Sequence, residues 1–184
     1  LQGETNLTYI NTNVYREFAL SGSIFLDTRC SRNFAGNYNL LYGHHMDNHG
    51  MFGDVALYKD EEFFRENQTG TLMLPNEVHD LKTLACIVTE ASDDALFDPG
   101  NWQETVTAVN EDGSVRVIGV RGEDDENYRP SKQEVERLRN LVGYCVENAL
   151  HVNEETMLEL EEKLDAGGNP RIVALSTCSS EYTN

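Results

Sequence analysis

The sequence has 184 residues, of which 39% are hydrophobic and 25% are charged, a composition typical of one globular domain with its own core. The formal net charge is −18, so nucleic acid and anionic lipid, whose binding requires a basic face, are not expected as partners. No apolar run approaches the roughly 18 residues of a membrane span. The chain begins at Leu1 rather than Met, without a visible signal peptide, and we expect a mature or trimmed form.

The first half of the chain is predicted to be rich in strands. Ser23–Thr28 and Asn37–Gly43 are short apolar runs next to glycine, a pattern typical of strands. A glycine-rich turn follows and leads into a short helix near Phe52–Tyr58. Thr69–Asn76 indicates a further strand, and Val78–Ala91 is expected to be one long strand-like run.

The second half is predicted to contain a hairpin and two helices before a last strand. The Asp112-Gly113 pair between two alternating runs indicates a hairpin turn. Ser131 and Glu134 have the spacing of a capping box, which predicts the start of a helix. A second helix is expected to begin at Asn153. Apolar residues of the first helix recur every three or four positions and form one stripe: Val135, Leu138, Val142, Cys145 and Ala149.

Four cysteines occur, and no two of them form a CxxC pair, which argues against a structural zinc site or a thioredoxin motif. Cys86 and Cys145 lie in apolar patterns and are expected to be buried thiols. The pattern around Cys30 is ambiguous. Cys178 differs from all three, because it ends the predicted strand Arg171–Cys178 among small polar residues.

Three histidines fall within six positions at the end of a predicted strand: His44, His45 and His49. A nucleophilic cysteine needs thiolate character and a proton donor for the leaving amine. Histidine can be that donor, since its ordinary pKa is about 6.5. The residues alone do not show that His44 and Cys178 meet in space.

A zinc hydrolase is the alternative reading of the histidine segment. Its ligands would come from His44, His45, Asp47 and His49, yet neither an HExxH nor an HxHxDH pattern is present. Neighbouring residues on a strand also point to opposite faces, so two adjacent histidines do not readily share one metal. We expect neither a metal nor a cofactor.

Three sequence motifs together resemble those of the class B sortases, both in their residues and in their order along the chain. They are GSIFLD from Gly22, YGHHM from Tyr42 with MFG from Met51, and LSTC from Leu175. The resemblance covers roughly Asn6 to Ser179 and departs from the family at Ala174, where a threonine is usual. It implies a mainly β fold with a helical insertion between about Ser131 and Ala166, namely the sortase-type eight-stranded β-barrel.

The resemblance also implies that residues 1–184 are a single catalytic domain truncated at both ends, without the first and last elements of the family. The family has an essential arginine on the strand after the cysteine strand, so it is expected beyond Asn184. Arg171 precedes the thiol on the same strand and is a poor substitute.

By this resemblance the chain is a cysteine transpeptidase. Cys178 is expected to attack the threonine carbonyl of a C-terminal sorting signal, and His44, which follows Gly43 as in the family, to transfer the protons. Ser179 would help to hold the oxyanion, and Ser176 and Thr177 would line the substrate groove. His45 and His49 are expected to be exposed loop histidines.

The partners implied are the sorting-signal peptide of a surface protein or pilin and an amine of a peptidoglycan cross-bridge or pilin. The implied location is the outer face of the cell membrane of a Gram-positive bacterium, where the only membrane attachment would be an N-terminal anchor outside this chain. The alternative is a catalytically inactive sortase-like surface domain.

Overall fold

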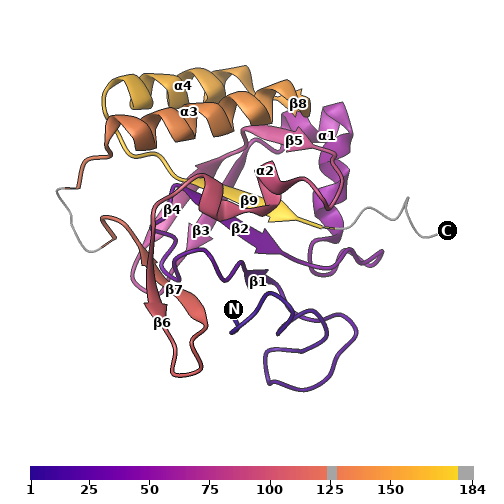
Figure 1. Cartoon of the computed structure of the whole chain (residues 1–184). Helices are drawn as coiled ribbons and strands as arrows, with labels where there is room; N and C mark the ends of the chain where they lie inside the picture. Colours follow the sequence, from indigo (N-terminus) through magenta and orange to yellow (C-terminus); the bar gives the residue numbers. More distant parts are fainter. Residues whose placement is uncertain (124–127, 178–184) are drawn as a thin grey trace.

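A computed structural model of the chain describes residues 1–123 and 128–177. Cys178 and Ser179, the predicted nucleophile and the predicted oxyanion-binding residue, lie outside the described residues. Strands and helices both contribute to the fold, and two long helices lie side by side along one flank of the strands (Figure 1). The strands are β1 Phe25–Leu26, β2 Tyr38–Tyr42, β3 Thr69–Met73, β4 Val78–Lys82, β5 Ala85–Ile87, β6 Thr105–Val109, β7 Val115–Val120, β8 Ala149–Val152 and β9 Ile172–Ser176. The helices are η1 Gly53–Lys59, α1 Glu61–Glu66, α2 Asp94–Phe97, η2 Pro99–Asn101, α3 Lys132–Glu147 and α4 Glu154–Asp165.

The sheet that matters for function has the strand order β1-β2-β9. β1 is antiparallel to β2, whereas β2 and β9 are parallel and in register from Tyr38 opposite Ile172 to Tyr42 opposite Ser176. Both long strands are rich in aromatic and aliphatic residues, which favour a pleated, half-buried surface. The remaining described strands form three two-stranded pairs, β3–β4, β5–β8 and β6–β7.

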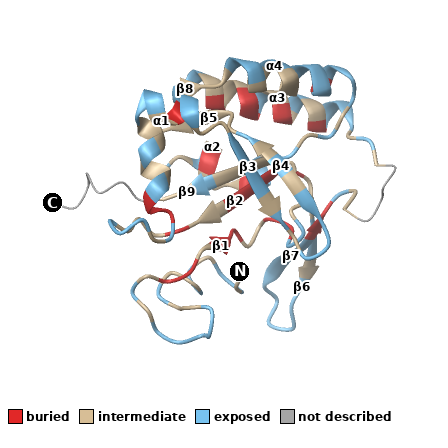
Figure 2. Ribbon diagram, turned by 180° about the vertical axis from the view of Figure 1, so that it is seen from behind, coloured by how far each residue is buried: buried red, intermediate tan, exposed pale blue. Residues whose placement is uncertain are grey.

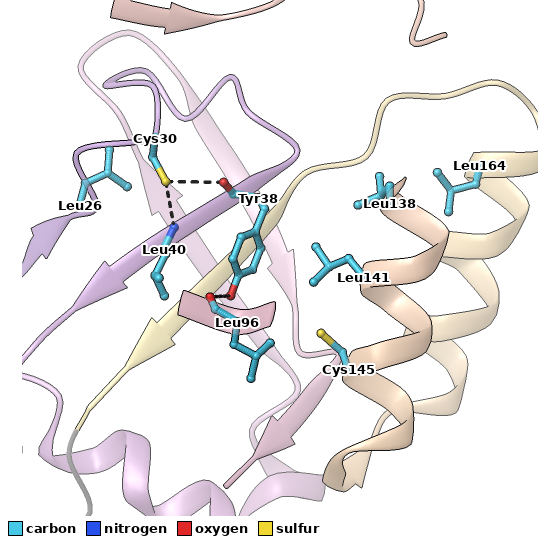
Figure 3. Packing of buried hydrophobic residues seen from close by; sticks show 9 residues of the cluster. All are labelled: Leu26, Cys30, Tyr38, Leu40, Leu96, Leu138, Leu141, Cys145 and Leu164. Atoms are coloured by element: carbon cyan, nitrogen blue, oxygen red, sulfur yellow. Dashed lines mark hydrogen bonds between the residues drawn. The ribbon is translucent and has the colours of Figure 1, made fainter. Parts of the chain in front are cut away.

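The core lies between β2 and the two long helices (Figure 3). Tyr38 and Leu40 of β2 are almost fully buried and belong to one cluster with Leu138 and Leu141 of α3. The hydroxyl of Tyr38 donates to the carbonyl oxygen of Leu96 at 2.9 Å, so its one polar atom is satisfied inside the core. This packing fixes β2, and with it the sheet, against α3.

Cys30, whose sequence pattern was ambiguous, is a buried core residue. Its thiol donates to the carbonyl oxygen of Tyr38 at 3.6 Å and accepts from the backbone N–H of Leu40 at 3.4 Å (Figure 3). Cys145 is buried as predicted, but Cys86 is only half-buried, because it lies on the two-stranded pair β5–β8 rather than in the central sheet.

The predicted first helix is α3, and it starts with the expected capping box. The Ser131 side chain accepts from the Glu134 backbone N–H at 3.3 Å, and the Glu134 carboxylate accepts from the Ser131 N–H at 2.8 Å. Its apolar stripe faces the core, as the buried stretches on α3 show (Figure 2). The stripe ends earlier than predicted, because Ala149 already belongs to β8.

Two strand predictions need correction. The run Val78–Ala91 is not one strand but β4 and β5, which pair with different partners, β3 and β8. β8 itself interrupts the helical segment between α3 and α4, where no strand was predicted. It forms because β5 offers an antiparallel partner, with Ala85 opposite Val152.

The predicted hairpin is β6–β7, and it projects from the body of the molecule on the side away from the last residues of β9 (Figure 1). Gly113 occupies the turn with φ +82°, a conformation that glycine adopts without steric cost. Val109 and Val115, cross-strand neighbours near the tip, are largely exposed. Among the described residues, no helix is both long and apolar enough to span a membrane.

Candidate functional site

The ends of β2 and β9 bring the two predicted motifs together. Tyr42, the last residue of β2, is the cross-strand partner of Ser176, the last residue of β9. The parallel alignment continues one step further, because the backbone N–H of Gly43 donates to the carbonyl oxygen of Ser176 at 3.0 Å. His44 stands two positions after Tyr42, and Cys178 stands two positions after Ser176. The two candidates therefore follow equivalent positions of neighbouring parallel strands.

His44 is half-buried, and its place is set by the MFG segment. Its carbonyl oxygen accepts from the backbone N–H of Phe52 at 3.0 Å, and the next residue, His45, forms an isolated bridge with Met51. A Cβ added to Gly43 would lie 2.6 Å from the ring of Phe52, so glycine is needed for this close approach. The YGHHM and MFG motifs thus form one packed unit at the end of β2.

The other two histidines differ from each other. The His49 side chain is 75% exposed, as predicted, and its Nδ1 lies 2.6 Å from Oδ1 of Asp54. The prediction of an exposed His45 is wrong: its side chain is only 19% exposed, and Nε2 lies 3.5 Å from Oδ1 of Asp47. Its Nδ1 is buried and has no hydrogen-bond partner within the described structure.

The loop that carries these histidines holds two residues in the left-handed backbone region, His49 at φ +61° and Met51 at φ +51°. Non-glycine residues in this region are strained, and such residues are frequent at functional sites. The three histidines have different neighbours, and within residues 1–123 and 128–177 no group of three or more His, Cys, Asp or Glu side chains could hold a metal ion.

Of the predicted groove residues, Ser176 and Thr177 are described, and both are half-buried at the end of β9. The hydroxyl oxygen of Thr177 is buried and lacks a hydrogen-bond partner in the described part of the chain. Arg171 is exposed and precedes the first residue of β9, so it stands at the opposite end of that strand from Thr177. This position agrees with its assignment as a poor substitute for the family arginine.

A buried polar cluster centred on Asp27 adjoins the end of β2, and sequence reasoning missed it. The Asp27 side chain is 0% exposed. Arg29 donates to both of its carboxylate oxygens, from Nε at 2.9 Å and from Nη2 at 2.7 Å, and the Tyr42 hydroxyl donates to Oδ2 at 2.9 Å. Burial acts to raise the pKa of Asp27, but the hydrogen bonds and charge of Arg29 outweigh it and hold that pKa below its ordinary value. The GSIFLD motif contains Asp27, so the motif was the available signal, although it did not reveal the partners.

Comparison with known proteins shows what this chain is similar to. No family model matches the chain. It is 35% identical over 68 residues to sortase B of Staphylococcus aureus and 36% identical over 69 residues to sortase B of Listeria monocytogenes. These matched stretches make up 37% and 38% of this chain and span 28% of each relative's length.

The solved structures agree over the whole chain. A class B sortase of Streptococcus pyogenes involved in pilus biogenesis has a TM-score of 0.66 and 28% identity, and the match covers 100% of this chain and 77% of that one. The chain is thus similar to class B sortases both in part of its sequence and in its fold. A Staphylococcus aureus sortase B–substrate complex shares the fold, with a TM-score of 0.64 at 20% identity over 100% of this chain and 66% of that one. The predicted sortase-type fold is confirmed.

Proposed function

We propose that this chain is the catalytic domain of a cysteine transpeptidase in which Cys178 is the nucleophile and His44 the proton-transfer group. One observation carries the proposal: Tyr42 of β2 pairs with Ser176 of the parallel strand β9. In the sequence, His44 comes two residues after Tyr42, and Cys178 comes two residues after Ser176. Parallel neighbours leave a sheet on the same edge, so the two chain segments leave the sheet together.

The proposed reaction has two halves. The Cys178 thiolate attacks the threonine carbonyl carbon of a sorting-signal peptide, the C–N bond breaks, and His44 gives its proton to the leaving amine. The acyl group is then held as a thioester. An incoming amine attacks that thioester, His44 takes up the amine proton, and the thiolate leaves, so that a new amide bond replaces the old one.

The residues around the thiol would support these steps. We assign oxyanion binding to the backbone N–H of Ser179 together with an arginine from the strand that the family places after the cysteine strand. Ser176 and Thr177 would line the substrate groove. The hydroxyl of Thr177, which has no hydrogen-bond partner among residues 1–123 and 128–177, supports this assignment, because a buried polar atom without a partner is costly unless a ligand satisfies it.

The substrates follow from the same assignment. The donor would be the sorting signal of a surface protein or pilin, and the acceptor an amine of a peptidoglycan cross-bridge or pilin. We place the enzyme on the outer face of the cell membrane of a Gram-positive bacterium, held there by an N-terminal anchor. Support comes from two similar structures, one a sortase involved in pilus biogenesis and the other a sortase–substrate complex.

Thioacyl formation with a panel of sorting peptides tests the proposal. Intact-mass spectrometry of the full-length enzyme should show the peptide adduct in the wild type, and Cys178→Ala and His44→Ala should each abolish it. His45→Ala should retain it. Equal loss from His45→Ala would overturn the choice of His44, and a wild type without adduct on any peptide would favour the inactive surface domain.

A further inference from the structure

Tyr42 joins the proposed site to the buried Asp27 cluster. It is the last residue of β2, pairs with Ser176, and stands two residues before His44. Its hydroxyl donates to Oδ2 of Asp27 at 2.9 Å, and its ring packs against Phe25 of β1 with the centroids 5.2 Å apart. Both ends of this side chain are therefore held, the ring by aromatic packing and the hydroxyl by a fixed carboxylate.

The carboxylate is itself fixed from several directions. Arg29 binds it through both oxygens, and Asn6 donates to Oδ2 at 2.8 Å. The same guanidinium donates to the carbonyl oxygen of Phe97 at 2.6 Å and lies 3.1 Å from Oδ1 of Asp98. The cluster thus ties β1 to the end of α2, and Tyr42 is the member that reaches the strand leading to His44.

The Tyr42 hydroxyl is not needed to compensate the charge of Asp27, since the bidentate contact with Arg29 already does so. A buried carboxylate is costly, and a fixed polar network most often serves to specify one arrangement of the chain. The arrangement specified here is the position of the last paired residue of β2.

We propose that Asp27, acting through the Tyr42 hydroxyl, is a positioning residue for the reaction. It holds the end of β2 so that His44 stays aligned with the end of β9 at Ser176. This inference rests on the proposed function. Neither residue takes part in the chemistry, so removal of the link should slow the chemical step without weakening peptide binding.

Tyr42→Phe is the variant of choice, because it keeps the ring and removes only the hydroxyl, whereas Asp27→Asn would also leave Arg29 without its carboxylate. Tyr144→Phe is the matched control. The Tyr144 hydroxyl also donates to a carboxylate, Oδ2 of Asp93 at 2.8 Å, but it lies on α3, away from the end of β2. Both variants lose one tyrosine–carboxylate hydrogen bond, and each should lower the Tm by about 3–10 °C.

The first readout is steady-state kinetics with a sorting peptide. We expect Tyr42→Phe to lower kcat by about tenfold with KM changed less than about twofold, because misplacement of a reacting group raises the barrier but leaves binding intact. Tyr144→Phe should keep the wild-type kcat. Equal kcat values for the two variants, with similar losses of Tm, would show that Tyr42 is only a structural residue.

The second readout does not need an active enzyme. The rate of iodoacetamide alkylation of Cys178, followed by peptide mass spectrometry over a pH series, reports its thiolate fraction. Tyr42→Phe should move the pH midpoint of Cys178 alkylation toward about 8.5, the ordinary pKa of a cysteine thiol. Tyr144→Phe should leave this midpoint unchanged. An unchanged midpoint in Tyr42→Phe overturns the inference. A shifted midpoint in an enzyme that forms no thioacyl adduct would retain it while the proposed function fails.

Discussion

The backbone N–H of Gly43 donates to the carbonyl oxygen of Ser176 at 3.0 Å, one step beyond the last paired residues of β2 and β9. This bond keeps the ends of β2 and β9 side by side at the edge of the sheet. Gly43 also lies close against the side chain of Phe52, which is buried. The point where the two predicted motifs meet is therefore a packed junction rather than an open loop.

Gly43→Ala should disturb this junction. The added Cβ would lie 2.6 Å from Cδ2 and 2.7 Å from Cγ of Phe52, so the ring or the backbone must move. We expect the free energy of unfolding to fall by about 1–3 kcal/mol, as for other overpacked sites. Urea unfolding measures this, with Gly70→Ala on β3 as control, because a Cβ there meets only Leu81 atoms at 3.8 Å or more. Similar unfolding energies for the two variants would contradict the junction described here.

Ser131→Ala should weaken the start of α3. The Ser131 side chain accepts the Glu134 N–H and is half of the capping box, so its loss leaves a helix-end N–H without a partner. The expected decrease in the free energy of unfolding is about 1 kcal/mol. Ser131→Thr keeps the accepting oxygen and should remain within about 0.5 kcal/mol of the wild type. If Ser131→Thr were as damaging as Ser131→Ala, the cap would not explain the effect.

Asp27 should make the fold sensitive to acid. Its pKa is lowered in the folded chain, so its stabilising contribution is complete above about pH 4, the ordinary pKa of an aspartate, and is lost as the pH falls through the lowered value. Asp27→Asn should lower the free energy of unfolding by about 2–4 kcal/mol at pH 6, because it leaves Arg29 without its carboxylate. Urea unfolding of both proteins from pH 7 to pH 3 tests this. The difference between their free energies of unfolding should be constant above about pH 5 and shrink below about pH 4. A difference that grows on acidification would contradict the lowered pKa of Asp27.

The buried cysteines should be inert in the folded protein. Burial is the main cause that raises the pKa of Cys30 to about 12 and that of Cys145 to about 11. At pH 8 the thiolate fraction of Cys30 is then on the order of one in ten thousand. Iodoacetamide labelling read by peptide mass spectrometry should leave both unmodified in the native chain and label both in urea. Labelling of native Cys30 at the rate seen in urea would contradict its burial.

The sequence predicted correctly those features that depend only on residues close together in the chain. The capping box at Ser131 and the turn at Asp112-Gly113 depend on a few neighbouring residues, and both appear where expected. The motifs YGHHM and MFG likewise mark the segment that packs around Gly43. The resemblance to class B sortases could then supply the fold, which no single motif determines.

The features that were missed depend on pairings that the local sequence pattern does not reveal. β8 forms because β5 lies next to it, and its own four residues carry no distinctive pattern. His45 is half-buried because its segment pairs with Met51, which spacing does not reveal. The hydrogen bond from Tyr42 to Asp27 links β2 to the residue after β1, so the charged residue in GSIFLD gave no sign that it would be buried.

The pairing of β2 with β9 also has a consequence for how the protein folds. Tyr42 and Ser176 are separated by 134 positions (176 minus 42), and all of this intervening segment must be synthesised before these strands can meet. Contacts of such long sequence separation form slowly, because the entropy of loop closure must be overcome before they contribute stability. In a nascent chain, β2 and the segment after it would therefore fold without β9. We expect the proposed nucleophile to gain its reactivity only after β9 has paired with β2.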